Sequence, residues 1–301
     1  MSNGFYPDSL LSTAGSHLSR TKTEACGWLE GDRISEAVKV AKISAVTVLC
    51  VGLDALLEGE QGDASNAEAG ADKPDLRLPI GQRKLIAEIL KLKRPLIVVQ
   101  IAGSAVTAEA ANEEANALVH AFYPGALGGR AVAELLFGMF SPSGRLPVTF
   151  YKDVSDIPDF TDYRMSNRTY KYYGGTPLYP FGYGLSYCGF EYGGIAFEGG
   201  AVSVGVTNKG GMGACESVQM YVSSPEKDAP RWRLKGFKNV RLAPGETRRV
   251  RFELTDELLL VPGDDGKRYK PEGVHTVYVG GSQPDARSES LTGKKVLKIN
   301  I

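Results

Sequence analysis

The sequence has few of the residues that build metal centres and disulfide frameworks. Its 301 residues include three histidines and four cysteines, the latter at Cys26, Cys50, Cys188 and Cys215. No CxxC pair occurs and the histidines show no ligand spacing, which argues against a zinc or redox centre. We therefore expect no metal site and no bound cofactor, and the scattered cysteines favour reduced thiols.

Net charge and long apolar runs are also missing. Lys+Arg and Asp+Glu both number 35, which excludes the basic excess typical of a nucleic-acid partner. No apolar run approaches the roughly 20 residues that span a bilayer, so no membrane partner is expected. The first twenty residues lack a basic start followed by an apolar core, so no signal peptide is predicted and a cytoplasmic location is slightly favoured.

Motifs for self-sufficient hydrolases and phosphate binding are absent. No G-x-S-x-G elbow occurs, and the glycine-rich turn Gly125–Gly129 lacks the Lys and Thr of a P-loop. A stand-alone hydrolase with different chemistry therefore remains the weakest of three hypotheses. Esterase activity that a single Ser substitution abolished would support it.

What is present begins with alternating strands and helices in the first half. Buried strands are indicated by continuous apolar runs, and helices by apolar residues at a spacing of three and four. Such alternation predicts a mostly parallel, helix-covered sheet. The strands are expected at 46–53, 96–101, 117–123 and 146–150, and the helices at 34–41, 79–94, 108–116 and 130–137.

The second half has a different rhythm. Short β-rich runs separated by turn residues are expected at 202–207, 217–222, 240–242, 248–254 and 275–279. About one hundred residues of this kind predict a fibronectin-type sandwich. We therefore expect an N-terminal tail (1–30), an α/β sandwich domain (31–152), a Tyr/Pro/Gly-rich strap (153–194) and a fibronectin type III-like domain (195–301). The strap's tyrosines suit packing between domains, with stacking on a sugar as the alternative.

An acidic, glycine-containing loop follows the first predicted strand. It places Asp54, Glu58, Glu60 and Asp63 directly after the apolar run 45–51. Ligands bind at the carboxyl ends of strands in open α/β sheets, so these carboxylates suggest acid/base chemistry, cation binding or recognition of sugar hydroxyls. A solvated acidic turn is the alternative. Glu58 and Glu60 are too close in sequence to flank one glycosidic bond from opposite sides, so a partner carboxylate would have to come from elsewhere.

Several segments together resemble glycoside hydrolase family 3, the β-glucosidases and β-xylosidases. The match extends roughly from residue 34 to residue 281. The segments are the acidic loop 52–63, LRLPIGQRKLI (76–86), 123–138 beginning YPG, PSGRLPVTF (142–150), RTY with PFGYGLSY (168–170 and 180–187), and LKGFK with LAPGET (234–238 and 242–247).

The resemblance implies a retaining glycosidase with three parts. Family members have a TIM-like barrel with the nucleophilic aspartate, an α/β sandwich whose loop supplies the acid/base glutamate, and often a fibronectin-like domain. A barrel needs about 250 residues, and the two predicted domains leave far fewer than that among these 301 residues, which also lack the aspartate motif. We therefore expect a barrel to act in trans or to have been lost by truncation.

The resemblance makes Glu58 the first choice for the acid/base and Glu60 nearly as good, while Asp54 and Asp63 shape the loop or touch substrate hydroxyls. The function expected is the C-terminal portion of a retaining β-glycosidase acting on a β-glycoside or oligosaccharide. Glucose and xylose preference both remain open. The alternative is a non-catalytic carbohydrate-binding or scaffold module.

Overall fold

The computed structural model describes residues 33–54, 58, 75–263 and 265–301. Its contacts divide the chain into two units. The N-terminal unit extends to residue 139 and includes 152–154, and the C-terminal unit comprises 140–151 and 155–301. The predicted tail 1–30 lies outside the described residues, as do Glu60 and Asp63.

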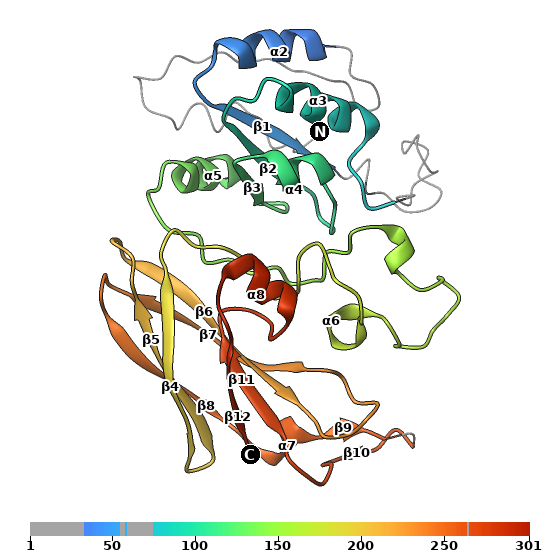
Figure 1. The fold of residues 1–301 in the computed structure, drawn as a ribbon, viewed down its shortest axis with the longest axis vertical. Helices are drawn as coiled ribbons and strands as arrows, with labels where there is room; N and C mark the ends of the chain where they lie inside the picture. The colour runs from blue at the N-terminus through green and yellow to red at the C-terminus, as the bar shows by residue number, and fades with distance from the viewer. Residues whose placement is uncertain (1–32, 55–57, 59–74, 264) are drawn as a thin grey trace. The chain divides into compact units, whose positions relative to one another are not determined.

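The N-terminal unit contains a three-stranded parallel sheet covered by helices on both faces (Figure 1). The strand order is β1-β2-β3, with Val48 beside Ile97 and Val98 beside Leu118. The elements in chain order are α2 (Ile34–Ile43), β1 (Thr47–Gly52), α3 (Ile80–Leu90), β2 (Leu96–Ile101), α4 (Glu109–Glu114), β3 (Ala117–His120) and α5 (Gly128–Leu136).

Successive side chains of the central strand β2 point to opposite faces of the sheet, so the core of this unit consists of two apolar clusters. Val98 faces an apolar cluster that includes residues of α2, α3 and α4, whereas Val99 packs with Val132 and Ala133 of α5. Both valines are fully buried, because successive side chains of a strand point to opposite faces and helices cover each face. The predicted α/β sandwich is confirmed.

The C-terminal unit holds two antiparallel sheets around one apolar core. One sheet has the order β12-β11-β6-β7 and the other β4-β5-β8. Val202, Val204 and Val206 alternate inward along β5, as a half-buried strand requires. The strands are β4 (Phe190–Glu198), β5 (Ala201–Asn208), β6 (Ala214–Ser223), β7 (Arg233–Leu242), β8 (Thr247–Glu253), β11 (Thr276–Gly280) and β12 (Leu297–Asn300). The all-β sandwich is confirmed.

Short elements complete this part of the chain. They are η1 (Val154–Asp156), α6 (Thr169–Tyr172), α7 (Asp256–Leu259), the paired β9 (Val261–Pro262) and β10 (Arg268–Tyr269), and α8 (Ala286–Thr292). Asp285 caps the start of α8, where its carboxylate accepts hydrogen bonds from the backbone N–H groups of Arg287 and Ser288.

The expected boundary of the α/β domain at residue 152 differs from the observed division, which assigns 140–151 to the C-terminal unit. The predicted strand 146–150 is also wrong. The Leu146 N–H donates to the Tyr183 carbonyl and the Phe150 N–H to the Tyr179 carbonyl, both at 2.9 Å. This segment therefore bonds to the strap rather than to the parallel sheet. The strap itself is shorter than expected, because β4 begins at Phe190.

Candidate active-site loop

The acidic loop leaves β1 at Gly52, a residue that no other amino acid can replace without strain. Its φ is +151°, and a Cβ there would lie 1.7 Å from the Ile101 carbonyl oxygen. Gln82, in the first turn of α3, fixes the same residue from the side. Its Oε1 accepts from the Gly52 N–H at 2.8 Å and its Nε2 donates to the Gly52 carbonyl at 2.7 Å. These contacts therefore fix the backbone direction at the start of the loop.

The Glu58 carboxylate is held by donors from the ends of the two other strands. The Gly103 N–H donates to Oε2 at 2.7 Å and the Ser104 N–H to Oε1 at 3.1 Å, both from the residues that follow β2. The Ser104 hydroxyl also donates to Oε1, and the hydroxyl of Tyr123, beyond β3, donates to Oε2. Residues that follow all three strands thus meet at the carboxyl edge of the sheet, where ligand sites form in open α/β folds.

Close packing around this carboxylate requires a glycine at 103. A Cβ on Gly103 would lie 2.6 Å from Cε2 of Tyr123 and 3.0 Å from Oε2 of Glu58. Burial, together with the hydrogen bond to Glu58 and the negative charge of that carboxylate, raises the pKa of the Tyr123 hydroxyl above its usual range. Tyr123 therefore stays protonated and remains a donor at neutral pH.

The remaining predicted site residues divide between described and undescribed positions. Asp54 stands at the start of the loop, and its carbonyl accepts from the Glu58 N–H at 2.9 Å. The Asp54 charge also contributes to the raised pKa of Tyr123. Glu60 and Asp63 lie outside the described residues, so Glu58 and Asp54 are the two candidates that the structure brings together.

Sequence reasoning missed the residues that hold Glu58. Gly103 and Ser104 follow the apolar strand 96–101, and a position just after a buried strand is the same signal that points to the acidic loop. Tyr123 and Gln82 lay inside segments that carried the family resemblance, but no role was assigned to them. Their positions after β3 and at the start of α3 explain why those segments matter to the loop.

Two other titratable side chains of this unit, His120 and Cys50, are poorly suited to acid/base work at neutral pH. Burial lowers the pKa of His120 to about 4 and raises the pKa of the Cys50 thiol to about 12, so both side chains are neutral at pH 7. In the described parts of the chain, no group of three or more His, Cys, Asp or Glu residues could hold a metal ion. Across the same residues, no helix is long and apolar enough to cross a membrane.

Comparison with known proteins agrees with this architecture. Residues 6–187 match the model of the glycosyl hydrolase family 3 C-terminal domain, and residues 216–283 match that of the fibronectin type III-like domain. A xylan 1,4-β-xylosidase from Xylanibacter ruminicola is 36% identical over 81% of this chain and 29% of its own length. A periplasmic β-glucosidase from Salmonella typhimurium is 31% identical over 82% of this chain and 34% of its own.

Solved structures give the same result. A β-glucosidase from Erythrobacter marinus shares 30% identity with a TM-score of 0.75, over 93% of this chain and 38% of that one. The chain thus spans roughly a third of the length of these relatives. Since the family model covers more than half of the sequence, the chain belongs to glycoside hydrolase family 3 and comprises the family's C-terminal domain followed by a fibronectin type III-like domain.

Proposed function

We propose that this chain is the C-terminal portion of a retaining β-glycosidase of the β-glucosidase or β-xylosidase type. It supplies the acid/base glutamate from the loop after β1, while the nucleophilic aspartate comes from a barrel outside these 301 residues. The observation that carries the proposal is the convergence of the acidic loop with the ends of β2 and β3. The named activities of the relatives, β-xylosidase and β-glucosidase, support the substrate class.

The mechanism requires one carboxyl group that carries a proton and one that is ionised. In retaining enzymes the acid protonates the departing oxygen, and the nucleophile, about 5–5.5 Å from it, forms the glycosyl-enzyme intermediate. The same acid/base group then takes a proton from water to release the sugar. This chain would perform only the proton transfers, from a glutamate of the loop after β1.

The contacts of Glu58 favour a positioning role for this residue. Two backbone N–H groups and two hydroxyls donate to its oxygens, and donors directed at a carboxylate stabilise its ionised form. A general acid must instead hold a proton and direct it at the substrate. The sequence put Glu58 ahead of Glu60, but these contacts lead us to propose the reverse order. Glu58 fixes the loop, and Glu60, two residues further on, transfers the proton.

The test uses a fusion of this chain to the N-terminal part of the Xylanibacter relative, with Glu58→Gln and Glu60→Gln variants. Loss of a general acid costs about 10²–10⁴ in rate. We expect Glu60→Gln to lower kcat/KM by that factor on xylobiose. On a 2,4-dinitrophenyl xyloside, whose leaving group needs no proton, kcat/KM should fall far less. Azide should rescue Glu60→Gln and yield a glycosyl azide.

Glu58→Gln is the matched control, since it makes the same change two residues away. We expect Glu58→Gln to lower kcat/KM on both substrates by the same factor, because it loosens the loop. Azide should not restore its activity. Azide rescue of Glu58→Gln but not of Glu60→Gln would reverse the assignment. Rescue of neither variant would remove the acid/base role from this loop.

A second candidate function, a non-catalytic carbohydrate-binding module, is favoured by two exposed aromatic side chains. Phe160 is 88% exposed and Tyr163 is 86% exposed. Their loop is held by Arg168, whose guanidinium donates to the carbonyls of Asp159 and Asp162 at 2.8 and 2.6 Å. Titration with cello- and xylo-oligosaccharides tests this function. Binding that Phe160→Ala and Tyr163→Ala abolish would support it, and no binding in either series would exclude it.

A further inference from the structure

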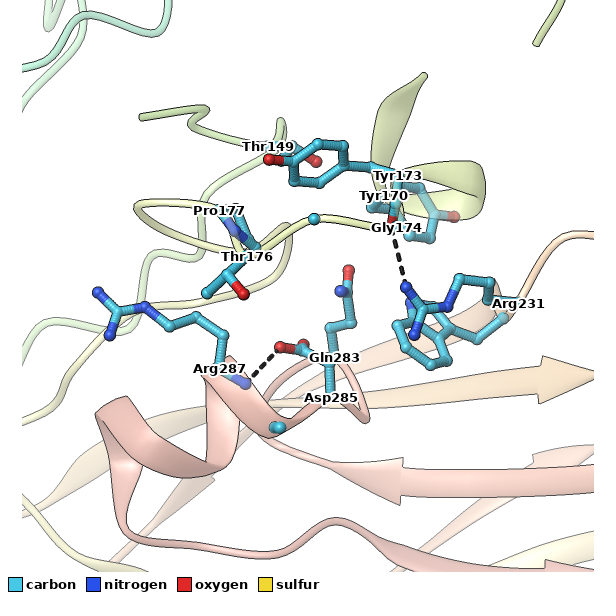
Figure 2. Close-up of a pocket in the computed structure, with 13 residues that line it drawn as sticks. Thr149, Tyr170, Tyr173, Gly174, Thr176, Pro177, Arg231, Gln283, Asp285 and Arg287 are labelled. Carbon is cyan, nitrogen blue, oxygen red and sulfur yellow. Dashed lines mark hydrogen bonds between the residues drawn. The ribbon is translucent and has the colours of Figure 1, made fainter. Parts of the chain in front are cut away.

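The C-terminal unit contains a polar cavity of about 170 Å³. Figure 2 shows it between the strap segment 170–177, the residues before α8, and Arg231. Drug-sized pockets usually measure about 300–1,000 Å³. A cavity of this size therefore suits one small molecule, or about six water molecules at ~30 Å³ each.

The charged side chains of the wall are already engaged. The Arg231 Nη1 donates to the Tyr173 carbonyl at 3.0 Å, and the Arg287 Nη2 donates to the Leu178 carbonyl at 3.1 Å. The Asp285 carboxylate accepts from the backbone N–H groups of Arg287 and Ser288 at 2.8 and 2.9 Å, where it caps α8. These charged side chains already have hydrogen-bond partners within the protein, so the groups of the wall that still lack a partner are uncharged.

Three uncharged side chains of the same wall have a buried polar atom without a hydrogen-bond partner among the described residues. These atoms are Oγ1 of Thr149, Nε1 of Trp232 and Oε1 of Gln283. Gln283 is only 5% exposed, and its amide points toward the strap segment across the cavity in Figure 2. Buried polar atoms nearly always have a protein or water partner, so three in one wall indicate that water or a ligand with hydroxyl groups occupies the cavity.

We propose that this cavity binds a small neutral polyhydroxy compound, about the size of a single sugar ring. Hydroxyls both donate and accept, so one such molecule can donate to the Gln283 Oε1 and accept from the Thr149 hydroxyl. The Thr149 hydroxyl and the Gln283 amide reach it by rotation about soft terminal torsions. Tyr170 and Tyr173 add the aromatic surface that suits the apolar face of a sugar.

The experiment uses the whole 301-residue chain with D-xylose, D-glucose and glycerol as separate probes. Saturation-transfer NMR detects binding and calorimetry measures Kd. Transfer to a sugar but not to glycerol identifies recognition of the ring, and transfer to both identifies recognition of adjacent hydroxyls. Either result supports the site. Transfer to none of the three means that the cavity holds only water, and overturns the proposal.

Variants locate the binding. Gln283→Leu and Thr149→Val each remove one polar partner at similar volume. Each should raise Kd about tenfold, which corresponds to about 1.4 kcal/mol of binding free energy. Ala286→Leu fills the cavity from an exposed position and should abolish binding without loss of buried contacts. Thr276→Val, which removes a hydroxyl on β11, should change nothing. Circular dichroism confirms folding. Equal affinity in Ala286→Leu and the unchanged chain would refute the assignment.

Discussion

Replacing Arg145 by methionine should strongly destabilise the C-terminal unit, because Arg145 joins the segment 140–151 to the sandwich. Its Nη2 donates to Oε2 of Glu216 at 2.7 Å, its Nε to the Gly281 carbonyl at 3.1 Å, and its Nη1 to the Gly144 carbonyl at 3.0 Å. Only 9% of the Arg145 side chain and 4% of the Glu216 side chain are exposed. Solvent therefore screens this ion pair very little.

The magnitude follows from what remains after the substitution. Methionine keeps most of the apolar stem, so packing changes little. Glu216 keeps one hydrogen bond, from the Tyr192 hydroxyl at 2.7 Å, but its charge stays buried without a cation. Removal of one partner of a buried ion pair costs about 3–5 kcal/mol. A domain is typically stable by about 5–15 kcal/mol, so this loss is a large share of the total.

Urea unfolding followed by tryptophan fluorescence measures the effect. The chain has two tryptophans, Trp28 and Trp232, so a Trp28→Phe background isolates the reporter of the C-terminal unit. The midpoint should fall with the urea dependence m unchanged. Adding Glu216→Gln, which removes the stranded charge, should restore part of the stability, so the two substitutions together cost less than their sum. A loss below about 1 kcal/mol, the range of exposed pairs, would refute the reasoning.

Three further predictions concern the acidic loop and one buried tyrosine. Gln82→Leu removes both hydrogen bonds to Gly52, which together contribute about 2 kcal/mol. Exchange of the Gly52 amide hydrogen should therefore accelerate about thirtyfold, and an unchanged exchange rate would contradict the role of Gln82. Tyr123→Phe removes one donor to Glu58 and should lower kcat of the barrel fusion about tenfold with KM unchanged, whereas an unchanged kcat would count against a positioned carboxylate. Burial raises the pKa of Tyr221 well above its usual range, so its contribution to stability is complete below about pH 10 and is lost as pH rises further; Tyr221→Phe should flatten the decline of Tm above pH 10, and an identical decline would refute this.

The sequence was most informative where burial is continuous. The strand 96–101 is buried at all but one position, because helices cover both faces of the parallel sheet there, and its position could be predicted. β7 was predicted only at 240–242, although it starts at Arg233, because its exposed positions carry Lys, Arg and Asn. The run 146–150 has the composition of a strand, but composition alone does not identify the chain segment that it pairs with.

The candidate site shows the same limit. The position of the acidic loop could be predicted, because it depends only on the strand just before it. The donors to Glu58 could not be predicted, because they lie 45 to 65 residues further along the chain and converge only through the order of the parallel strands. The resemblance to a family predicts that the loop supplies the acid/base, but it could not show that the Glu58 carboxylate already accepts four hydrogen bonds.

The most direct test of the account is the rate at which the chain hydrolyses 4-nitrophenyl β-D-xyloside and β-D-glucoside, alone and fused to the N-terminal part of the Xylanibacter relative. If the chain supplies the proton donor and another segment the covalent attacker, the fusion cleaves at least one of the two compounds and the purified chain neither. Cleavage by the purified chain itself, retained after every contaminating glycosidase is removed, would contradict it.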